Sequence, residues 1–183
     1  MTKKIIIPLL VIGIFFGWQS VRAQKQIEIV MPKANFDVEM AMKMLNTGKS
    51  EIKGVALYEE RAGLIQRKIG DPVYARVGEV VSLYPITPYF AEFLELQKKN
   101  KNGKRMAAIS REVNSFRILT KVYSLKGEFI FIGLAPGKYY IETTVYFPNG
   151  VGGPEVSGVV EIKTDGETAN IILKKKYVSL FGN

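Results

Sequence analysis

The stretch GEFIFIGLAPGKYYI, residues 127–141, decides the fold class of this chain. It is typical of a strand, a tight corner and a second strand. Phe129 and Phe131 alternate with isoleucines, so both aromatic rings are expected on one face of the first strand. Pro136-Gly137 supplies the corner, because proline fixes φ and glycine accepts a positive φ. Tyr139 then begins a second alternating run, which predicts the next strand.

Outward from this hairpin, alternating apolar residues and turn residues continue along the chain. Strands are predicted over residues 52–57, 73–77, 79–84, 116–123, 128–134, 138–147, 156–163 and 169–175. Short strands with regular turn signals predict an all-β fold, an antiparallel β-sandwich of about seven strands. We expect no internal repeat and no second domain.

Two helical segments interrupt the β pattern. A short helix is predicted from Val38 to Leu45, capped by Asp37 and stopped near Gly48. A helical insertion is predicted around 88–99, because a threonine hydroxyl followed by proline is a favourable helix start.

A basic stretch, residues 98–105, follows the second helix. It is typical of a solvated loop, with contact to an anionic surface as the alternative. Insertions on rigid scaffolds often carry function, so we expect an interaction surface here. Its candidate residues are Tyr89, Phe90, Lys98, Lys99, Lys101, Lys104 and Arg105.

The first 23 residues predict an export signal. Lys3 and Lys4 precede an apolar run over 5–18, and small or apolar residues at Val21 and Ala23 fit cleavage before Gln24. The apolar run is shorter than the roughly 20 residues of a spanning helix. We therefore expect an exported protein of the periplasm or cell surface, with inner-membrane anchoring by an uncleaved signal as the alternative.

Composition excludes several function classes. The chain has no cysteine and no histidine, which excludes disulfides, a lipid anchor on cysteine, the Ser-His-Asp triad and the usual zinc sites. We expect no catalytic residues, no metal site and no cofactor. The net charge is +9, and loss of Lys3, Lys4 and Arg22 with the signal leaves +6 (9 − 3). Because the protein is expected to be exported, we expect no nucleic acid as a partner, whereas an envelope protein, an acidic polysaccharide or peripheral membrane contact fits.

The decisive stretch reads G-x-F-x-F-x-G-L-x-P-G-x-Y. The residues that make up this fold signature are Gly127, Phe129, Phe131, Gly133, Leu134, Pro136, Gly137 and Tyr139. This pattern resembles the carboxypeptidase regulatory-like domains, which are transthyretin-like (prealbumin-like) β-sandwiches, in a bacterial exported subgroup. Residues 52–56 are similar to the family's first strand, residues 78–89 to its G-x-x-V-x-L-x-P-x-T-P-Y segment, and residues 166–173 to its last hairpin.

The resemblance implies an accessory domain rather than an enzyme. Hydrolases of this fold rely on histidines that the chain lacks. Some adhesin relatives form a Lys–Asn isopeptide crosslink, for which Lys53 and Asn170 are the candidates here. The resulting domain organisation is a signal peptide over 1–23, a lead-in with a short helix over 24–49, the sandwich over 50–176 and a tail over 177–183.

Three functions remain open at this point. The first is a non-catalytic module for protein interaction or structural support in the bacterial envelope. The second is a carbohydrate-binding module, whose aromatic candidates are Tyr84, Tyr89, Phe90, Tyr139, Tyr140, Tyr146 and Phe147. The third is a glycan-acting enzyme with Glu92 and Glu95 as paired carboxylates. A calcium site at 165–167 is disfavoured, because the segment is too short for a ligand loop.

Overall fold

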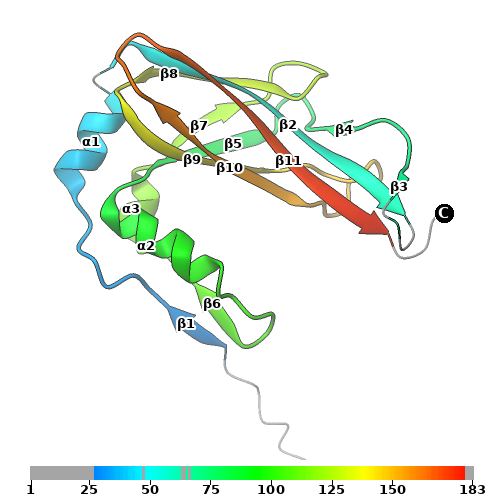
Figure 1. Cartoon of the computed structure of the whole chain (residues 1–183), viewed down its shortest axis with the longest axis horizontal. Helices are drawn as coiled ribbons and strands as arrows, with labels where there is room; N and C mark the ends of the chain where they lie inside the picture. Colours follow the sequence, from blue (N-terminus) through cyan, green and yellow to red (C-terminus); the bar gives the residue numbers. More distant parts are fainter. Residues whose placement is uncertain (1–26, 47, 63–64, 66, 180–183) are drawn as a thin grey trace, which may run out of the picture.

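The computed structural model describes residues 27–46, 48–62, 65 and 67–179. The expected signal and its cleavage point therefore lie outside the described residues. Two β-sheets face each other, and helices cover one side of the pair (Figure 1). The all-β sandwich expected from the sequence is confirmed.

One sheet has four strands in the order β10-β9-β5-β7. Their bounds are Val80–Pro85 for β5, Ile118–Lys121 for β7, Gly137–Thr144 for β9 and Glu155–Ile162 for β10. All of these neighbours pair in antiparallel fashion. We call this the helix-covered sheet, because α2 (Pro88–Gln97) and α3 (Arg111–Ser115) lie on its outer face.

The second sheet is built around one long strand, β2, which spans Ser50–Ala62. On one side β2 pairs with β11, which spans Thr168–Ser179. On the other side it pairs with β8 (Glu128–Leu134), β4 (Val73–Tyr74) and β3 (Arg67–Lys68). The β2–β11 pairing is parallel, so the sandwich is not antiparallel throughout. β11 also extends past residue 176, where we expected the domain to end.

Two of the three described helices, α2 and α3, lie together as a helical layer on the outer face of the helix-covered sheet (Figure 1). The third, α1 (Val38–Asn46), packs at one end of the sandwich, where Met44 and Leu45 join the core between the sheets. A small parallel ribbon pairs β1 (Glu28–Val30) with β6 (Arg105–Ala107) beyond α2 (Figure 1). Both predicted helices are confirmed, whereas β1, β3, β6 and α3 were not predicted. These unpredicted elements have at most five residues, too few for a periodic pattern to stand out.

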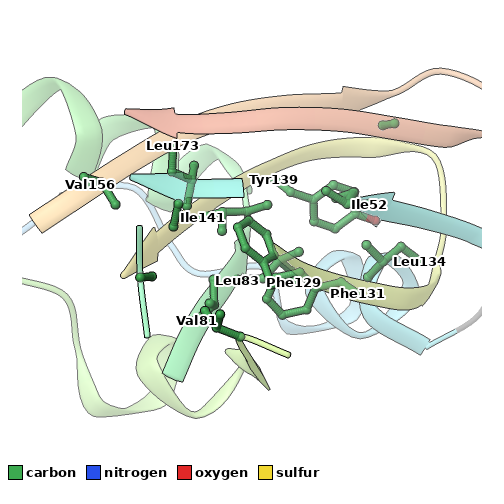
Figure 2. Packing of buried hydrophobic residues seen from close by; sticks show 14 of the residues in the cluster. Ile52, Val81, Leu83, Phe129, Phe131, Leu134, Tyr139, Ile141, Val156 and Leu173 are labelled. Atoms are coloured by element: carbon green, nitrogen blue, oxygen red, sulfur yellow. The ribbon is translucent and has the colours of Figure 1, made fainter. Parts of the chain in front are cut away.

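Apolar side chains from both sheets fill the space between them (Figure 2). Ile52 and Leu173 project from the β2 sheet toward Leu83 and Ile141 of the helix-covered sheet. All four side chains are completely buried. The fold therefore rests on packing, as expected of a chain without disulfides.

The residues of the decisive stretch have the predicted burial. Phe129, Phe131, Leu134 and Tyr139 are buried, and Ile132 is exposed on the opposite face. Gly127 has a φ of 70°, and a Cβ there would lie 2.5 Å from the Ala56 carbonyl oxygen.

The corner at Gly137 has the positive φ that the sequence predicts. Its φ of 158° is a backbone conformation that residues with a side chain rarely adopt. A Cβ at Gly137 would also lie 2.6 Å from Met44 Cε of α1. The backbone conformation and the closeness of the Met44 side chain therefore both favour glycine at this position.

Among the residues that the structure describes, no helix is long and apolar enough to span a bilayer.

Candidate functional site

A cleft of about 410 Å³ opens between the helix-covered sheet and the helical layer. Sheet residues form its floor, and α2, β6 and α3 form its wall. The lining residues are Tyr84, Phe90, Phe93, Gln97, Ala107, Ala108, Ile109, Ser110, Arg111, Asn114, Tyr140, Glu142 and Glu155. We call this hollow the sheet–helix cleft.

A second hydrophobic cluster supports one end of the cleft. Tyr84 stacks on Phe90 with ring centroids 5.0 Å apart, and Tyr140 lies 5.6 Å from Phe90. The Tyr84 hydroxyl donates to Asn114 Oδ1 at 3.2 Å. This cluster joins the sheet to α2 and α3, and so holds the wall against the floor.

Helix caps orient the wall. The Thr87 hydroxyl accepts from the Phe90 N–H, which starts α2 beside the sheet. Ser110 caps α3 by accepting from the Val113 N–H, and the Ser110 N–H donates to the Tyr89 hydroxyl. Thus Arg111 and Asn114 of α3 have a defined position at the cleft.

Two carboxyl groups lie on the floor of the cleft. Glu142 on β9 is opposite Ser157 of β10, and Glu155 lies two residues before Ser157 on the same face. Burial raises the pKa of Glu142 above its usual range, and the nearby Glu155 raises it further. A hydrogen bond with the Tyr140 hydroxyl acts in the opposite direction and lowers the pKa of Glu142. A carboxyl with a perturbed pKa in a cleft is a frequent property of binding sites.

The cleft offers donors and acceptors together. Glu142 and Glu155 provide acceptor oxygens, Asn114 provides an amide, and Arg111 provides guanidinium donors. A half-buried apolar side chain, Phe93, stands beside these groups. Such a surface suits a neutral ligand with many hydroxyl groups.

Two expected interaction residues are buried, which corrects the sequence prediction. Tyr89 is 6% exposed and Phe90 is 1% exposed. Both rings pack between α2 and the sheet, because the outer face of that sheet is itself apolar at Tyr84 and Tyr140. Neither residue forms part of an exposed contact surface, although Phe90 lines the sheet–helix cleft.

The basic stretch of residues 98–105 is an ordered turn rather than an irregular loop. The Lys101 N–H donates to the Arg105 carbonyl, and the Lys104 N–H donates to the Lys101 carbonyl. Lys98 forms an ion pair with Glu95 at 2.6 Å. Lys99, Lys101 and Lys104 are exposed and Arg105 is half-buried. The turn thus presents a cluster of cations at the end of α2.

The aromatic stacking platform expected for a carbohydrate module is absent from the predicted positions. Tyr84, Tyr89, Phe90, Tyr139 and Tyr140 are all buried, and Tyr146 and Phe147 are half-buried. Their alternation along strands reflects core packing.

The proposed Glu92–Glu95 carboxylate pair has structural roles. Glu92 accepts hydrogen bonds from the Lys33 and Ala34 N–H groups, which lower its pKa. Glu95 forms the ion pair with Lys98. Glu92 therefore ties the N-terminal segment to α2, and neither carboxylate lines the sheet–helix cleft.

The two isopeptide candidates lie opposite each other on neighbouring strands, but their environment opposes formation of the isopeptide bond. Lys53 on β2 is opposite Asn170 on β11, and both are exposed on the outer face of the sheet. The Lys53 ammonium lies 2.7 Å from Glu51, and this contact raises the pKa of Lys53. A protonated amine cannot attack an amide, and water competes at an exposed site.

The segment 165–167 is a turn. Asp165 accepts from the Lys49 N–H, and Glu167 accepts from the Lys163 and Thr164 N–H groups. No group of three or more carboxylates that could hold a metal ion occurs within the described part of the chain.

Sequence reasoning missed Glu142, Glu155 and Asn114. Glu142 alternates with buried residues on β9, so the sequence pattern marks it only as an outward-facing strand residue. The available signal was a carboxyl residue within a strand whose neighbouring residues, Tyr140, Ile141 and Thr143, are buried.

The comparison with known proteins identifies a similar fold but no sequence family. No known family model matches this chain, and no curated protein matches its sequence. Among solved structures, a similar fold occurs in a protein from Pseudomonas aeruginosa described as a "putative carbohydrate binding protein". The TM-score is 0.55 at 15% sequence identity, over 80% of this chain and 100% of that chain. At this identity the likeness establishes a shared β-rich fold.

Proposed function

We propose that this protein is an exported, non-catalytic saccharide-binding module. The observation that carries the proposal is the sheet–helix cleft, in which two carboxyl groups, an amide and a guanidinium surround one hollow. Of the functions that the sequence left open, this was the alternative to a protein-interaction module.

The polar groups of the cleft match the chemistry of sugar hydroxyls. A hydroxyl group both donates and accepts, so it pairs with a carboxylate and with an amide or guanidinium at once. The predominance of hydrogen bonding over stacking follows from the burial of Tyr84 and Tyr140, whose rings support the cleft from below. Hydrogen bonds to charged groups are the stronger class.

The Pseudomonas aeruginosa protein supports this choice. Its description names carbohydrate binding, and its whole chain is covered by the alignment of the two folds. Fold similarity alone does not transfer a site, so the cleft residues carry the argument.

Binding without turnover is proposed from the spacing of the carboxyl groups. Glu142 and Glu155 are close enough for a side-chain hydrogen bond between them, which contributes to the raised pKa of Glu142. Glycosidase carboxyl pairs stand about 5 Å apart or more, because the sugar must fit between them. This pair is better suited to hold hydroxyl groups than to cleave a glycosidic bond.

A glycan array followed by calorimetry on the best ligands tests the proposal. Glu155→Gln and Asn114→Ala should each weaken binding by about 10-fold or more, the usual effect of losing a hydrogen bond that involves a charged or buried group. Glu161→Gln is the matched control, because Glu161 is exposed on the same strand, β10, and does not line the cleft.

The proposal fails if no glycan binds, or if the control variant weakens binding as much as the cleft variants do. Mass spectrometry of the bound oligosaccharide checks the second part. Shortened products would contradict a role without turnover.

A further inference from the structure

We propose that the β1–β6 ribbon and the basic turn beside it form a surface that contacts anionic lipid headgroups. This surface lies outside the sheet–helix cleft and does not depend on saccharide binding. Its evidence is the coincidence of exposed apolar side chains and cations on one projecting element. In Figure 1 the ribbon lies on the far side of α2 from the two sheets.

Opposite faces of the ribbon differ in burial. In the parallel pairing Val30 is opposite Ala107, and both are half-buried on the face toward the cleft, which Ala107 lines. Ile29 is opposite Met106, and these side chains are 63% and 49% exposed. Because side chains alternate along a strand, Ile27 and Met31 lie on the same outer face as Ile29, and both are exposed.

The cations adjoin this apolar stripe. Ile27 and Met106 line a small hollow together with Lys101 of the basic turn, so an apolar and a basic part of the surface adjoin there. Lys99, Lys101 and Lys104 form no ion pair with any residue that the structure describes. Glu28, the acidic residue of β1, is opposite Arg105 on the other face.

Cations beside exposed apolar side chains are the combination that binds an anionic membrane surface. The lysines meet the headgroups while the apolar side chains enter the interface. An acidic polysaccharide would use the cations but would leave Ile29 and Met106 in water. The apolar stripe therefore favours lipid as the occupant.

The position of the N-terminus agrees with this assignment. The ribbon begins at the first described residues, and the apolar run over 5–18 precedes it in the sequence. Eight residues, 19–26, separate the two, and they reach about 30 Å at most when extended. If the signal is retained, it therefore holds the ribbon near the bilayer.

Vesicle flotation of the full chain, expressed with export, tests the surface. The vesicles contain phosphatidylglycerol and phosphatidylcholine in equal parts, or phosphatidylcholine alone. Combined Lys99→Gln, Lys101→Gln and Lys104→Gln substitutions should lower the partition coefficient on anionic vesicles by about 100-fold, and Ile29→Gln by about 10-fold. The matched control replaces three exposed lysines elsewhere, Lys68, Lys126 and Lys175, by glutamine and should have no comparable effect.

A label distinguishes the ribbon from the rest of the chain even where a retained signal anchors every variant. The chain has no cysteine, so Met106→Cys accepts an environment-sensitive fluorophore at one position. Its emission should shift to the blue on anionic vesicles. The same label at Leu125→Cys, which is 88% exposed on the sandwich, should not shift.

The inference is overturned if the label at position 106 does not shift, or if both labels shift alike. It is also overturned if the control lysine variant loses as much binding as the turn variant. Binding of the basic turn to an acidic polysaccharide, with no binding to anionic vesicles, would reassign the surface.

Discussion

Removing one hydroxyl group, in Tyr139→Phe, tests how the decisive stretch holds the fold. Tyr139 is completely buried on β9. Its hydroxyl proton is shared between two carbonyl oxygens, that of Ala135 in the corner between β8 and β9 at 2.5 Å and that of Met44 in α1 at 2.8 Å. Burial raises the pKa of Tyr139, so the hydroxyl remains a donor at neutral pH. One side chain thus joins α1 to the central hairpin.

The expected loss of stability depends on which hydrogen-bond donors the two carbonyl groups keep after the substitution. The Met44 carbonyl keeps a second donor, the Ala135 N–H, whereas the Ala135 carbonyl loses its hydrogen-bond donor. Leaving one partly buried carbonyl unsatisfied costs about 1–3 kcal/mol. A loss of about 2 kcal/mol lowers Tm by roughly 4–8 °C in a domain of this size. The phenylalanine ring preserves the packing, so little else should change.

Urea unfolding followed by far-UV circular dichroism measures the loss. Hydrogen exchange should also quicken in α1 and the β8–β9 corner more than in β10. Tyr123→Phe is the control, because Tyr123 is 58% exposed on the sandwich. A loss below about 0.5 kcal/mol, the usual effect of a surface substitution, would refute the role assigned to the Tyr139 hydroxyl.

Three further predictions concern the core, the cleft and the helical layer. Gly54→Ala should destabilise the protein by about 1–3 kcal/mol in urea unfolding, since the new Cβ would lie 2.1 Å from Phe129 Cζ; an unchanged midpoint would contradict it. Glu142→Gln should become stabilising as pH rises. Because the folded-state pKa of Glu142 is raised, the unfolded chain releases this proton first, and the wild type loses stability from about pH 4.5 up toward the folded pKa. The free energies of unfolding of the wild type and of Glu142→Gln, measured at about pH 4 and pH 7, check this sign. An equal difference between the two proteins at both pH values would contradict it. Thr87→Ala should cost about 1 kcal/mol and speed amide exchange at the start of α2, because the Phe90 N–H loses its cap; unchanged exchange there would show that the cap is dispensable.

The cleft illustrates what local patterns do not encode. Asn114 and Tyr84 are 30 residues apart, yet their side chains share a hydrogen bond. Glu142 and Glu155 occupy the two strands of one hairpin, but the cleft that they line is completed by α2, β6 and α3. The same lack of tertiary information explains why the sequence predicted an interaction surface at Tyr89 and Phe90. An apolar sheet face buries both side chains.

The sequence by itself determined the sandwich core, the hairpin over 127–141 and the two longer helices. Each of these depends on periodic burial and turn residues within one segment, and those signals are local. Only the tertiary structure decided the parallel β2–β11 pairing, the sheet–helix cleft and the β1–β6 ribbon. Glu28 and Arg105 are paired across 77 residues (105 − 28), and such a pairing depends on the free energy of the whole assembled chain rather than on either segment.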